Sequence, residues 1–278
     1  MTDSEYVLIR RRVHELLGID LNAYKSTQMR RRLDAYLLRV RAKSWPEYFR
    51  LLEQSAEERQ RFKDYLTINV TSFFRDADKF ATLRERILPQ LLDESRTLQI
   101  WSAGCSDGAE PYSLAMLVRS IAPNQRLQIW ATDIDRSALS RAIAGGPYPE
   151  QSVENVPRML RAQFLVPCEG GYRVKPELQR LIRFQEHNLL RDPVRDRFDL
   201  IVCRNVIIYF TEEAKAAVFQ LFARSLRPGG FLFIGATETI PLQQARELGL
   251  EPVQLTFYRR VEPSATTVRA SHQARLAT

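Results

Sequence analysis

The spacing of apolar residues changes once along the chain, after roughly the first ninety residues. Before that point apolar residues recur every three or four positions, which is the period of amphipathic helices. Ile9 and Val13 follow this spacing, and Gly18 is placed to end their helix. Ser44 is placed to begin another helix, with Glu47 completing a capping box. The first part of the chain is therefore predicted to be all-helical.

The rest of the chain alternates short apolar runs with helical periods. Helices are predicted at residues 76–92, 110–121, 136–144 and 212–226. Strands are predicted at residues 98–101, 127–132, 181–186, 198–203, 230–235 and 253–258. Alternation of this kind indicates an α/β domain with a mostly parallel sheet covered by helices on both faces.

These patterns divide the chain into a helical N-terminal domain at 1–75 and an α/β domain at 76–261. The stretch before the third predicted strand is too long for one helical crossover, and 170–174 has the composition of part of a β-hairpin. We therefore expect a small inserted β-subdomain at about 150–180. Residues 262–278 are poor in bulky apolar side chains and are expected to form a flexible tail.

Composition narrows the class of protein. No apolar run approaches the length of about 20 residues that crosses a bilayer, and the first residues lack a secretory signal pattern. Three scattered cysteines and three histidines give neither a disulfide framework nor a metal pattern, so we expect a cytoplasmic protein without a metal. The net charge of +8 favours an acidic partner, which charge alone leaves open among nucleic acid, an anionic membrane surface and an acidic protein.

Two strand ends carry candidate chemistry. The first strand runs into a loop of small residues around Gly104, and the second ends at Asp133. The loop would let a nucleoside approach the backbone, and the carboxylate would accept hydrogen bonds from both ribose hydroxyls. The alternative is an ordinary turn followed by a helix N-cap, although Asp135 can serve as that cap instead. The pair together favours nucleoside binding.

The kind of nucleoside follows from what this loop lacks. The sequence has neither a Gly-x-Gly-x-x-Gly motif nor a Gly-Lys-Ser/Thr phosphate loop, and the turn carries the acids Asp107 and Glu110. Acidic side chains would repel a pyrophosphate, whereas a cationic sulfonium tolerates them. S-adenosylmethionine therefore fits better than a dinucleotide.

Several segments, in order, resemble the CheR-type glutamate methyltransferases of chemotaxis receptors, and the resemblance runs from about Tyr6 to Arg260. The matching segments are residues 68–76, 101–114, 131–135, 187–190, 203–210 and 235–238. The resemblance implies a helical N-terminal domain and a Rossmann-like class I methyltransferase domain with a seven-stranded sheet and a small inserted β-subdomain. It also implies methyl transfer from S-adenosylmethionine to glutamates of chemoreceptors, with S-adenosylhomocysteine as product.

The resemblance implies a set of cofactor-binding residues: Asn69, Thr71, Arg75, Glu110, Asp133, Asn188, Leu189, Asn205 and Val206. Glu110 would face the cationic methionine end and Asp133 the ribose. The pair at 188–189 would meet the adenine, and the segment 69–75 would lie over the cofactor as a lid. One departure is that the family often has two glutamates where this chain has Ala109 and Glu110.

The implied reaction does not require the protein to transfer a proton. A glutamate with a pKa of about 4.3 is already ionised at neutral pH, so an in-line displacement needs no general base. By the resemblance, Arg75 and Tyr209 are the catalytic candidates. Arg75 would orient the incoming carboxylate, and Tyr209 would place its hydroxyl beside the reacting methyl group.

Two alternatives remain open. A nucleic-acid methyltransferase also suits a basic chain, but amino-methylating enzymes commonly carry Asn/Asp-Pro-Pro-Tyr, and the run from Asn205 to Tyr209 has no proline. A non-catalytic module could bind the cofactor as a sensor, although the presence of Arg75 and Tyr209 argues for activity. We therefore expect the cytoplasmic helical region of a chemoreceptor as partner, with neither nucleic acid nor membrane insertion.

A basic segment in the helical domain is the candidate docking surface. Its basic residues are Arg30, Arg31, Arg32, Arg39, Arg41 and Lys43, against the single acid Asp34. Its apolar stripe is Leu33, Tyr36, Leu37 and Val40. If the stripe packs inward, the exposed charge would attract an acidic, helical receptor region. The alternative is a solvated helix face with no partner.

Overall fold

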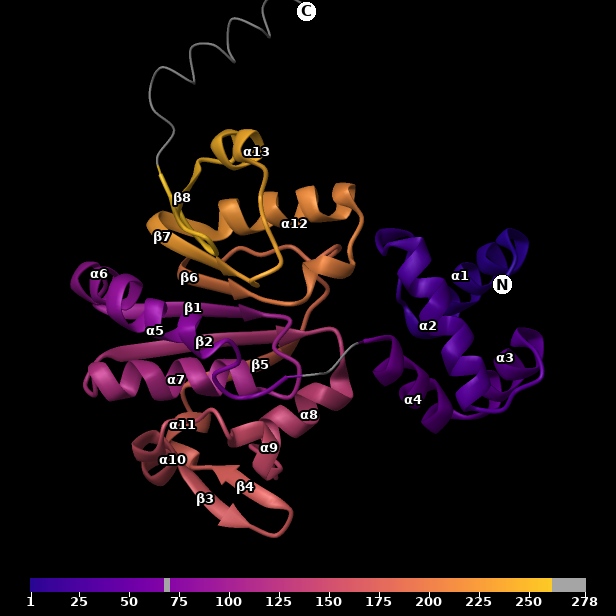
Figure 1. The fold of residues 1–278 in the computed structure, drawn as a ribbon, viewed down its shortest axis with the longest axis horizontal. Coiled ribbons are helices and arrows are strands. Elements are labelled where there is room, and N and C mark those ends of the chain that lie inside the picture. Colours follow the sequence, from indigo (N-terminus) through magenta and orange to yellow (C-terminus); the bar gives the residue numbers. More distant parts are fainter. Residues whose placement is uncertain (68–70, 262–278) are drawn as a thin grey trace, which may run out of the picture.

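The computed structural model describes residues 1–67 and 71–261. Its helical N-terminal part lies beside one end of an α/β part (Figure 1). The N-terminal elements are α1 (Asp3–Leu17), the short 3-10 turn η1 (Leu21–Ala23), α2 (Ser26–Arg39), α3 (Trp45–Gln54) and α4 (Ala56–Leu66). They enclose a core of their own, in which the rings of Tyr36, Tyr48 and Phe62 meet.

The predicted helix ends are mostly correct in this part. Gly18 ends α1 in the left-handed conformation at φ 72°, and the Ser44 side chain accepts a hydrogen bond from the Glu47 amide at the start of α3. The predicted capping box is wrong in one detail, because the Glu47 carboxylate accepts from the Lys43 amide rather than from that of Ser44. Helix α4 was not predicted, although Ser55 caps it.

The α/β part is built on a seven-stranded sheet in the order β5-β2-β1-β6-β7-β9-β8. The strands are β1 (Thr97–Ala103), β2 (Arg126–Asp133), β5 (Ile182–Glu186), β6 (Phe198–Cys203), β7 (Leu226–Ile234), β8 (Leu250–Gln254) and β9 (Phe257–Arg260). All neighbours are parallel except β9, which is antiparallel to both β7 and β8. The predicted α/β class with a mostly parallel seven-stranded sheet is confirmed.

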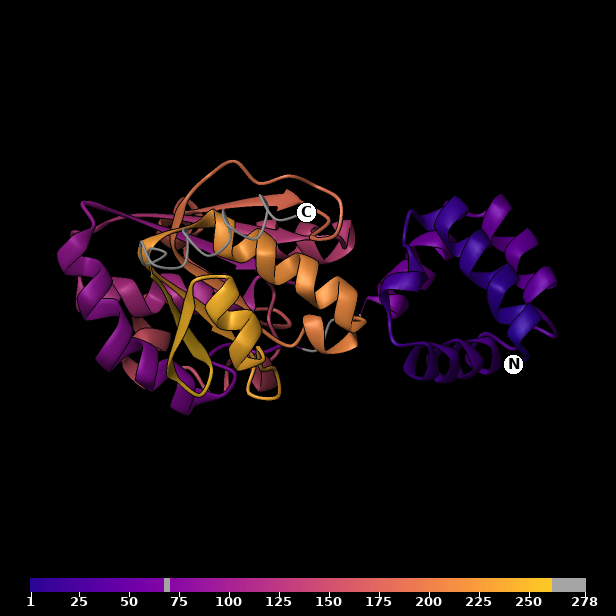
Figure 2. The same ribbon diagram turned by 90° about the horizontal axis from the view of Figure 1, so that it is seen from above.

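Helices cover the sheet on two faces (Figure 2). One face packs against α5 (Ala77–Thr82), the π-helical turn η2 (Leu83–Ile87), α6 (Leu88–Glu94), α7 (Ala109–Ile121) and α8 (Arg136–Ala144). The other packs chiefly against α12 (Glu212–Ser225) and α13 (Leu242–Glu247). Alternate residues of each strand enter the two cores, so Ile100 joins the first and Trp101 the second.

A small subdomain lies between α8 and β5, as predicted. It consists of α9 (Glu150–Val153), α10 (Arg158–Phe164), β3 (Leu165–Cys168), β4 (Gly171–Val174) and α11 (Pro176–Gln179). Strands β3 and β4 pair antiparallel as a separate hairpin. The boundaries of 1–75, 76–261 and about 150–180 stay predictions. The expected tail at 262–278 lies outside the described residues.

One strand prediction is wrong. Residues 253–258 do not form one strand but the end of β8, a turn at Leu255 and Thr256, and the start of β9. The turn contains no glycine, proline or asparagine, so the sequence carries no local signal for it. Among the described residues, no helix combines the length and the apolar character needed to cross a bilayer.

Candidate functional site

A cavity opens at the carboxyl ends of the parallel strands, where the sheet faces α2 and the end of α4. It holds about 1260 Å³ of empty space, open solvent at its mouth included. Its walls come from the ends of β1, β2, β5 and β6, from residues 71–75 and from the start of α2. Ligands of open α/β sheets bind at this edge because the loops that follow the strands converge there.

Asp133 ends β2 and lines the cavity. Its carboxylate accepts backbone hydrogen bonds from Ser106 at 2.8 Å and from Asp135 at 2.9 Å. Burial raises the pKa of Asp133 to about 6. Asp135 caps α8 by accepting from the amides of Ser137 and Ala138, so Asp133 is not the N-cap of that helix.

Glu110 lies in the first turn of α7, directly after the Gly104 loop. Its carboxylate accepts a hydrogen bond from the Ser102 hydroxyl at 2.8 Å and lies 3.4 Å from the Arg204 guanidinium. Burial raises the pKa of Glu110, and the charge of Arg204 opposes that rise. The cavity therefore holds a second carboxylate, whose position is fixed by two partners.

Arg204 was not predicted as a site residue, and it connects three parts of the cavity. Besides its contact with Glu110, it donates hydrogen bonds to the Arg75 carbonyl at 2.7 Å and to the Asp76 carboxylate at 2.6 Å. Its side chain is only 3% exposed. The guanidinium lies over the ring of Phe80, 5.5 Å from the centroid. Arg204 therefore holds the segment that carries Arg75 against the end of β6.

The loop after β6 carries Asn205, Val206 and Tyr209, all of which line the cavity. Asn205 adopts a left-handed φ of 60°, an uncommon conformation that asparagine tolerates. The buried carboxylate of Glu238 accepts from the Asn205 amide at 3.3 Å and from the Ile208 amide at 3.2 Å. Glu238, also not predicted as a site residue, therefore fixes the loop that presents these side chains.

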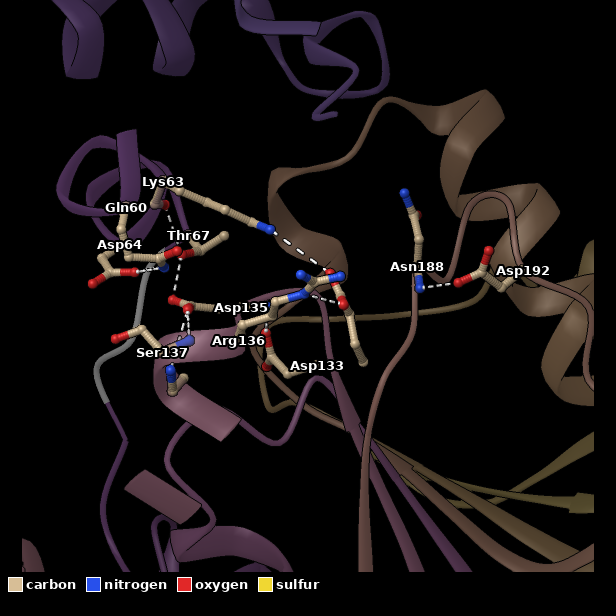
Figure 3. Close-up of polar contacts among 12 residues, drawn as sticks. Gln60, Lys63, Asp64, Thr67, Asp133, Asp135, Arg136, Ser137, Asn188 and Asp192 are labelled. Atoms are coloured by element: carbon tan, nitrogen blue, oxygen red, sulfur yellow. Dashed lines mark hydrogen bonds and ion pairs between the residues drawn. The ribbon is translucent and has the colours of Figure 1, made fainter. Parts of the chain in front are cut away.

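The helical part closes the cavity from the other side at two places. The Lys25 amide donates to the Tyr209 carbonyl at 2.9 Å, which ties the start of α2 to the loop after β6. At the end of α4, the Thr67 hydroxyl donates to Asp135 at 2.9 Å (Figure 3). The backbone N–H of Asn188, after β5, donates a hydrogen bond to the Asp192 carboxylate at 2.7 Å. Asn188 lies across the cavity from Thr67 in the same view.

The structure thus brings most of the predicted residues together, although their roles stay predictions. The predicted cofactor and catalytic residues that line the cavity are Thr71, Arg75, Glu110, Asp133, Asn188, Leu189, Asn205, Val206 and Tyr209. Asn69 lies outside the described residues, so the predicted lid is described only from residue 71 onward. Phe73 and Phe74 are buried in the core.

The predicted basic helix differs from the structure in two respects. Helix α2 ends at Arg39, so Arg41 and Lys43 lie beyond it. Arg30 forms an ion pair with Asp3, and Arg32 donates to the Tyr65 carbonyl and lines the cavity. Packing on the neighbouring helices, which the local pattern does not encode, takes up these two side chains. Arg31, Arg39 and Arg41 are exposed.

The cavity suits S-adenosylmethionine in its chemistry. A Cβ at Gly104, where φ is 82°, would collide with the side chain of Val206, so a glycine is needed where the loop packs against this cavity-lining residue. The carboxylates of Glu110 and Asp133 suit a sulfonium and a ribose. Among residues 1–67 and 71–261, no group of three or more histidine, cysteine or acidic side chains could hold a metal.

Comparison with known proteins agrees with this geometry. The chain matches the CheR methyltransferase SAM-binding domain over residues 69–255 and the CheR methyltransferase all-alpha domain over residues 4–67. A chemotaxis protein methyltransferase of Listeria monocytogenes is 40% identical, over 92% of this chain and 97% of that protein. Chemotaxis protein methyltransferase 2 of Pseudomonas aeruginosa is 36% identical, over 85% and 87%. The chain therefore belongs to the CheR methyltransferase family and is an S-adenosylmethionine-dependent methyltransferase.

Proposed function

We propose that this enzyme methylates side-chain carboxylates of glutamates on a chemoreceptor in the cytoplasm, giving methyl esters. The observation that carries the proposal is that charges of both signs line the cavity. Glu110 and Asp133 lie at the strand ends, Lys25 and Arg32 come from the helical part, and Arg75 lies near Glu110. The acids would suit a positive cofactor and the basic residues a negative substrate.

Each proposed cofactor-binding residue would contact the part of the cofactor that suits its chemistry. Asp133 would accept from the ribose hydroxyls, since its backbone donors leave lone pairs on both oxygens. Glu110 would face the cationic methionine end. Asn188 and Leu189 would offer a polar edge and an apolar face to the adenine. Bound S-adenosylmethionine would supply an electrophilic methyl group, which a carboxylate oxygen can take from the sulfonium with S-adenosylhomocysteine as the leaving group.

The remaining residues would position the substrate and exclude water. Arg75 would pair with the incoming glutamate carboxylate, held in place by the bond from Arg204 to its carbonyl. Tyr209, whose backbone is tied to Lys25, would place its hydroxyl beside the transferring group without taking a proton. An ionised carboxylate is the attacking group, so positioning and loss of water account for the rate.

The names of the relatives support chemotaxis as the setting, since both compared proteins are called chemotaxis protein methyltransferases. The test is a transfer assay with radiolabelled S-adenosylmethionine, which offers receptor-containing membranes and then RNA. Alkali-labile label on receptor protein is expected, because carboxyl esters hydrolyse readily in base. Label on RNA would support the nucleic-acid alternative, and no transfer to either would favour a non-catalytic module.

A further inference from the structure

The segment between β5 and β6 leaves part of one sheet face without a helix. Residues 187–197 contain no helix or strand. The face that carries Trp130 and Gln128 on β2 and Arg183 on β5 therefore meets solvent, whereas the opposite face of β2 is buried. Trp130 is only partly buried, packed on Phe198 and its neighbours.

A second cavity lies at this place, at the amino-terminal ends of the strands and away from the cofactor site. It holds about 1200 Å³ of empty space, open solvent included. Four arginines line it, Arg180, Arg183, Arg197 and Arg227, against the single acid Asp196. Trp130 lies on its wall.

The arginines are largely available for a partner. Arg227 forms an ion pair with buried Asp199 at 2.8 Å. The other three are exposed, and none of their side chains makes a hydrogen bond or ion pair with the residues that the structure describes. Guanidinium groups bind carboxylates and phosphates in a two-pronged geometry, so this cavity is built for anions.

The spacing of the arginines indicates an elongated occupant. Arg183 lies on β5, and Arg197 lies directly before β6, three strands along the order β5-β2-β1-β6. Adjacent strands are about 4.8 Å apart, so these two positions are separated by about 14 Å across the sheet. A single phosphate spans a small part of that distance, whereas about four residues of extended chain cover it.

We propose that this surface, which we call the open-face cavity, docks an acidic polypeptide segment, with carboxylates on the arginines and apolar atoms against Trp130. The proposal does not depend on the glutamate specificity proposed above. The surface lies at the opposite ends of the strands from the cofactor, so a bound segment would leave the cofactor site accessible.

Tryptophan fluorescence gives a local readout. The other two tryptophans, Trp45 and Trp101, are 6% and 0% exposed, so a change on adding ligand reports chiefly on Trp130. The probe is a peptide of about eight glutamates, long enough to span the cavity. It is titrated into the full chain saturated with S-adenosylhomocysteine, at low salt. A saturable change, absent in Trp130→Phe, is expected.

Two double charge reversals locate the binding. Arg183→Glu/Arg197→Glu should weaken the fluorescence-detected affinity about tenfold or more, since each reversal replaces an attraction with a repulsion. Arg31→Glu/Arg39→Glu, on α2, should leave it within about twofold. Both sites are exposed, and unchanged affinity for S-adenosylhomocysteine would show that each variant is folded.

Three results would overturn the proposal. The first is the absence of any Trp130-dependent signal at low salt. The second is a loss of peptide binding in the α2 variant alone. The third is binding of inorganic phosphate or a nucleotide that displaces the peptide at lower concentration, which would assign the cavity to small phosphate-bearing anions.

Discussion

The charges of the cofactor cavity and those of α2 are held in different ways. Arg204 is 3% exposed and has three oxygen partners, one of which, the Glu110 carboxylate, also accepts from the Ser102 hydroxyl. On α2, Arg31 and Arg39 are exposed on an open helix face. Buried charges can define the geometry of a site because the loss of one partner leaves the other charge buried and unpaired. Exposed charges attract a partner weakly and over a longer distance.

This difference predicts a hierarchy of effects. Substitutions among the buried charges should change stability and cofactor affinity by large factors at any salt concentration. Substitutions on α2 should change only encounters with a charged partner, and salt should abolish that effect because exposed charges are screened over about 10 Å at 0.1 M.

The largest effect is expected for Arg204→Met. Removing one partner of a buried ion pair typically costs about 3–5 kcal/mol, and here it also releases the Arg75 carbonyl and Asp76. Urea unfolding should show a loss of that size. Arg204→Lys is the matched control, because it keeps the charge and should recover part of the stability. An Arg204→Met variant as stable as the parent would mean that the network does not hold the cavity together.

Asp133→Ala should weaken cofactor binding at least tenfold. The variant loses two hydrogen bonds to a charged acceptor, each worth about 1.5–3 kcal/mol. Calorimetry with S-adenosylhomocysteine measures the change, and Asp107→Ala, on the same loop region but outside the cavity lining, is the control. Unchanged affinity in folded Asp133→Ala would remove this carboxylate from the site.

The raised pKa of Asp133 predicts a pH dependence of cofactor affinity. Burial raises this pKa to about 6, and ribose hydroxyls would stabilise the ionised form, so binding lowers the pKa. Affinity should be constant above about pH 6 and fall below it by about tenfold per unit, until the pKa of the bound form is reached. In Asp133→Asn the inflection near 6 should vanish, and any remaining dependence would come from other groups of the cavity, such as Glu110, whose pKa burial raises, and His187, whose pKa burial lowers.

Tyr209→Phe separates chemistry from binding, since it deletes one hydroxyl and keeps the ring. A neutral hydrogen bond is worth about 0.5–1.5 kcal/mol, so turnover should fall about twofold to twelvefold while cofactor affinity stays the same. Single-turnover methylation measures the rate of the chemical step, and calorimetry measures the cofactor affinity. Turnover at the parent rate would leave Tyr209 with a structural role only, through its backbone bond to Lys25.

The smallest effect is expected on α2. Arg31→Glu/Arg39→Glu should raise KM for receptor a few-fold at low salt, since exposed ion pairs contribute about 0.2–1 kcal/mol each. Both kcat and cofactor affinity should be unaffected, and added salt should bring parent and variant together. A normal KM at low salt would mean that the exposed charges of this helix are solvated and do not contact the receptor.

Sequence reasoning located the part of the cavity that depends on position along a strand. Asp133 ends the second predicted strand and the Gly104 loop follows the first, and the carboxyl ends of parallel strands meet at one edge, so these two segments could be expected to lie together. Asn188 was expected from the family resemblance. Arg204 was missed because its partners Asp76 and Glu110 lie 128 and 94 residues away in the chain. The ion pair of Arg30 with Asp3 likewise joins two separate helices, and the β8–β9 turn was missed because it contains none of the usual turn residues.

Methylation of glutamate carboxylates distinguishes the proposed function from its alternatives. Mass spectrometry of receptor fragments, after incubation with the enzyme and S-adenosylmethionine, is the direct test. We expect a mass increase of one methylene on particular glutamates, reversed by mild alkali and absent with Asp133→Ala at limiting cofactor. A stable methyl group on lysine, arginine or an amide side chain, with the glutamates unchanged, would contradict it.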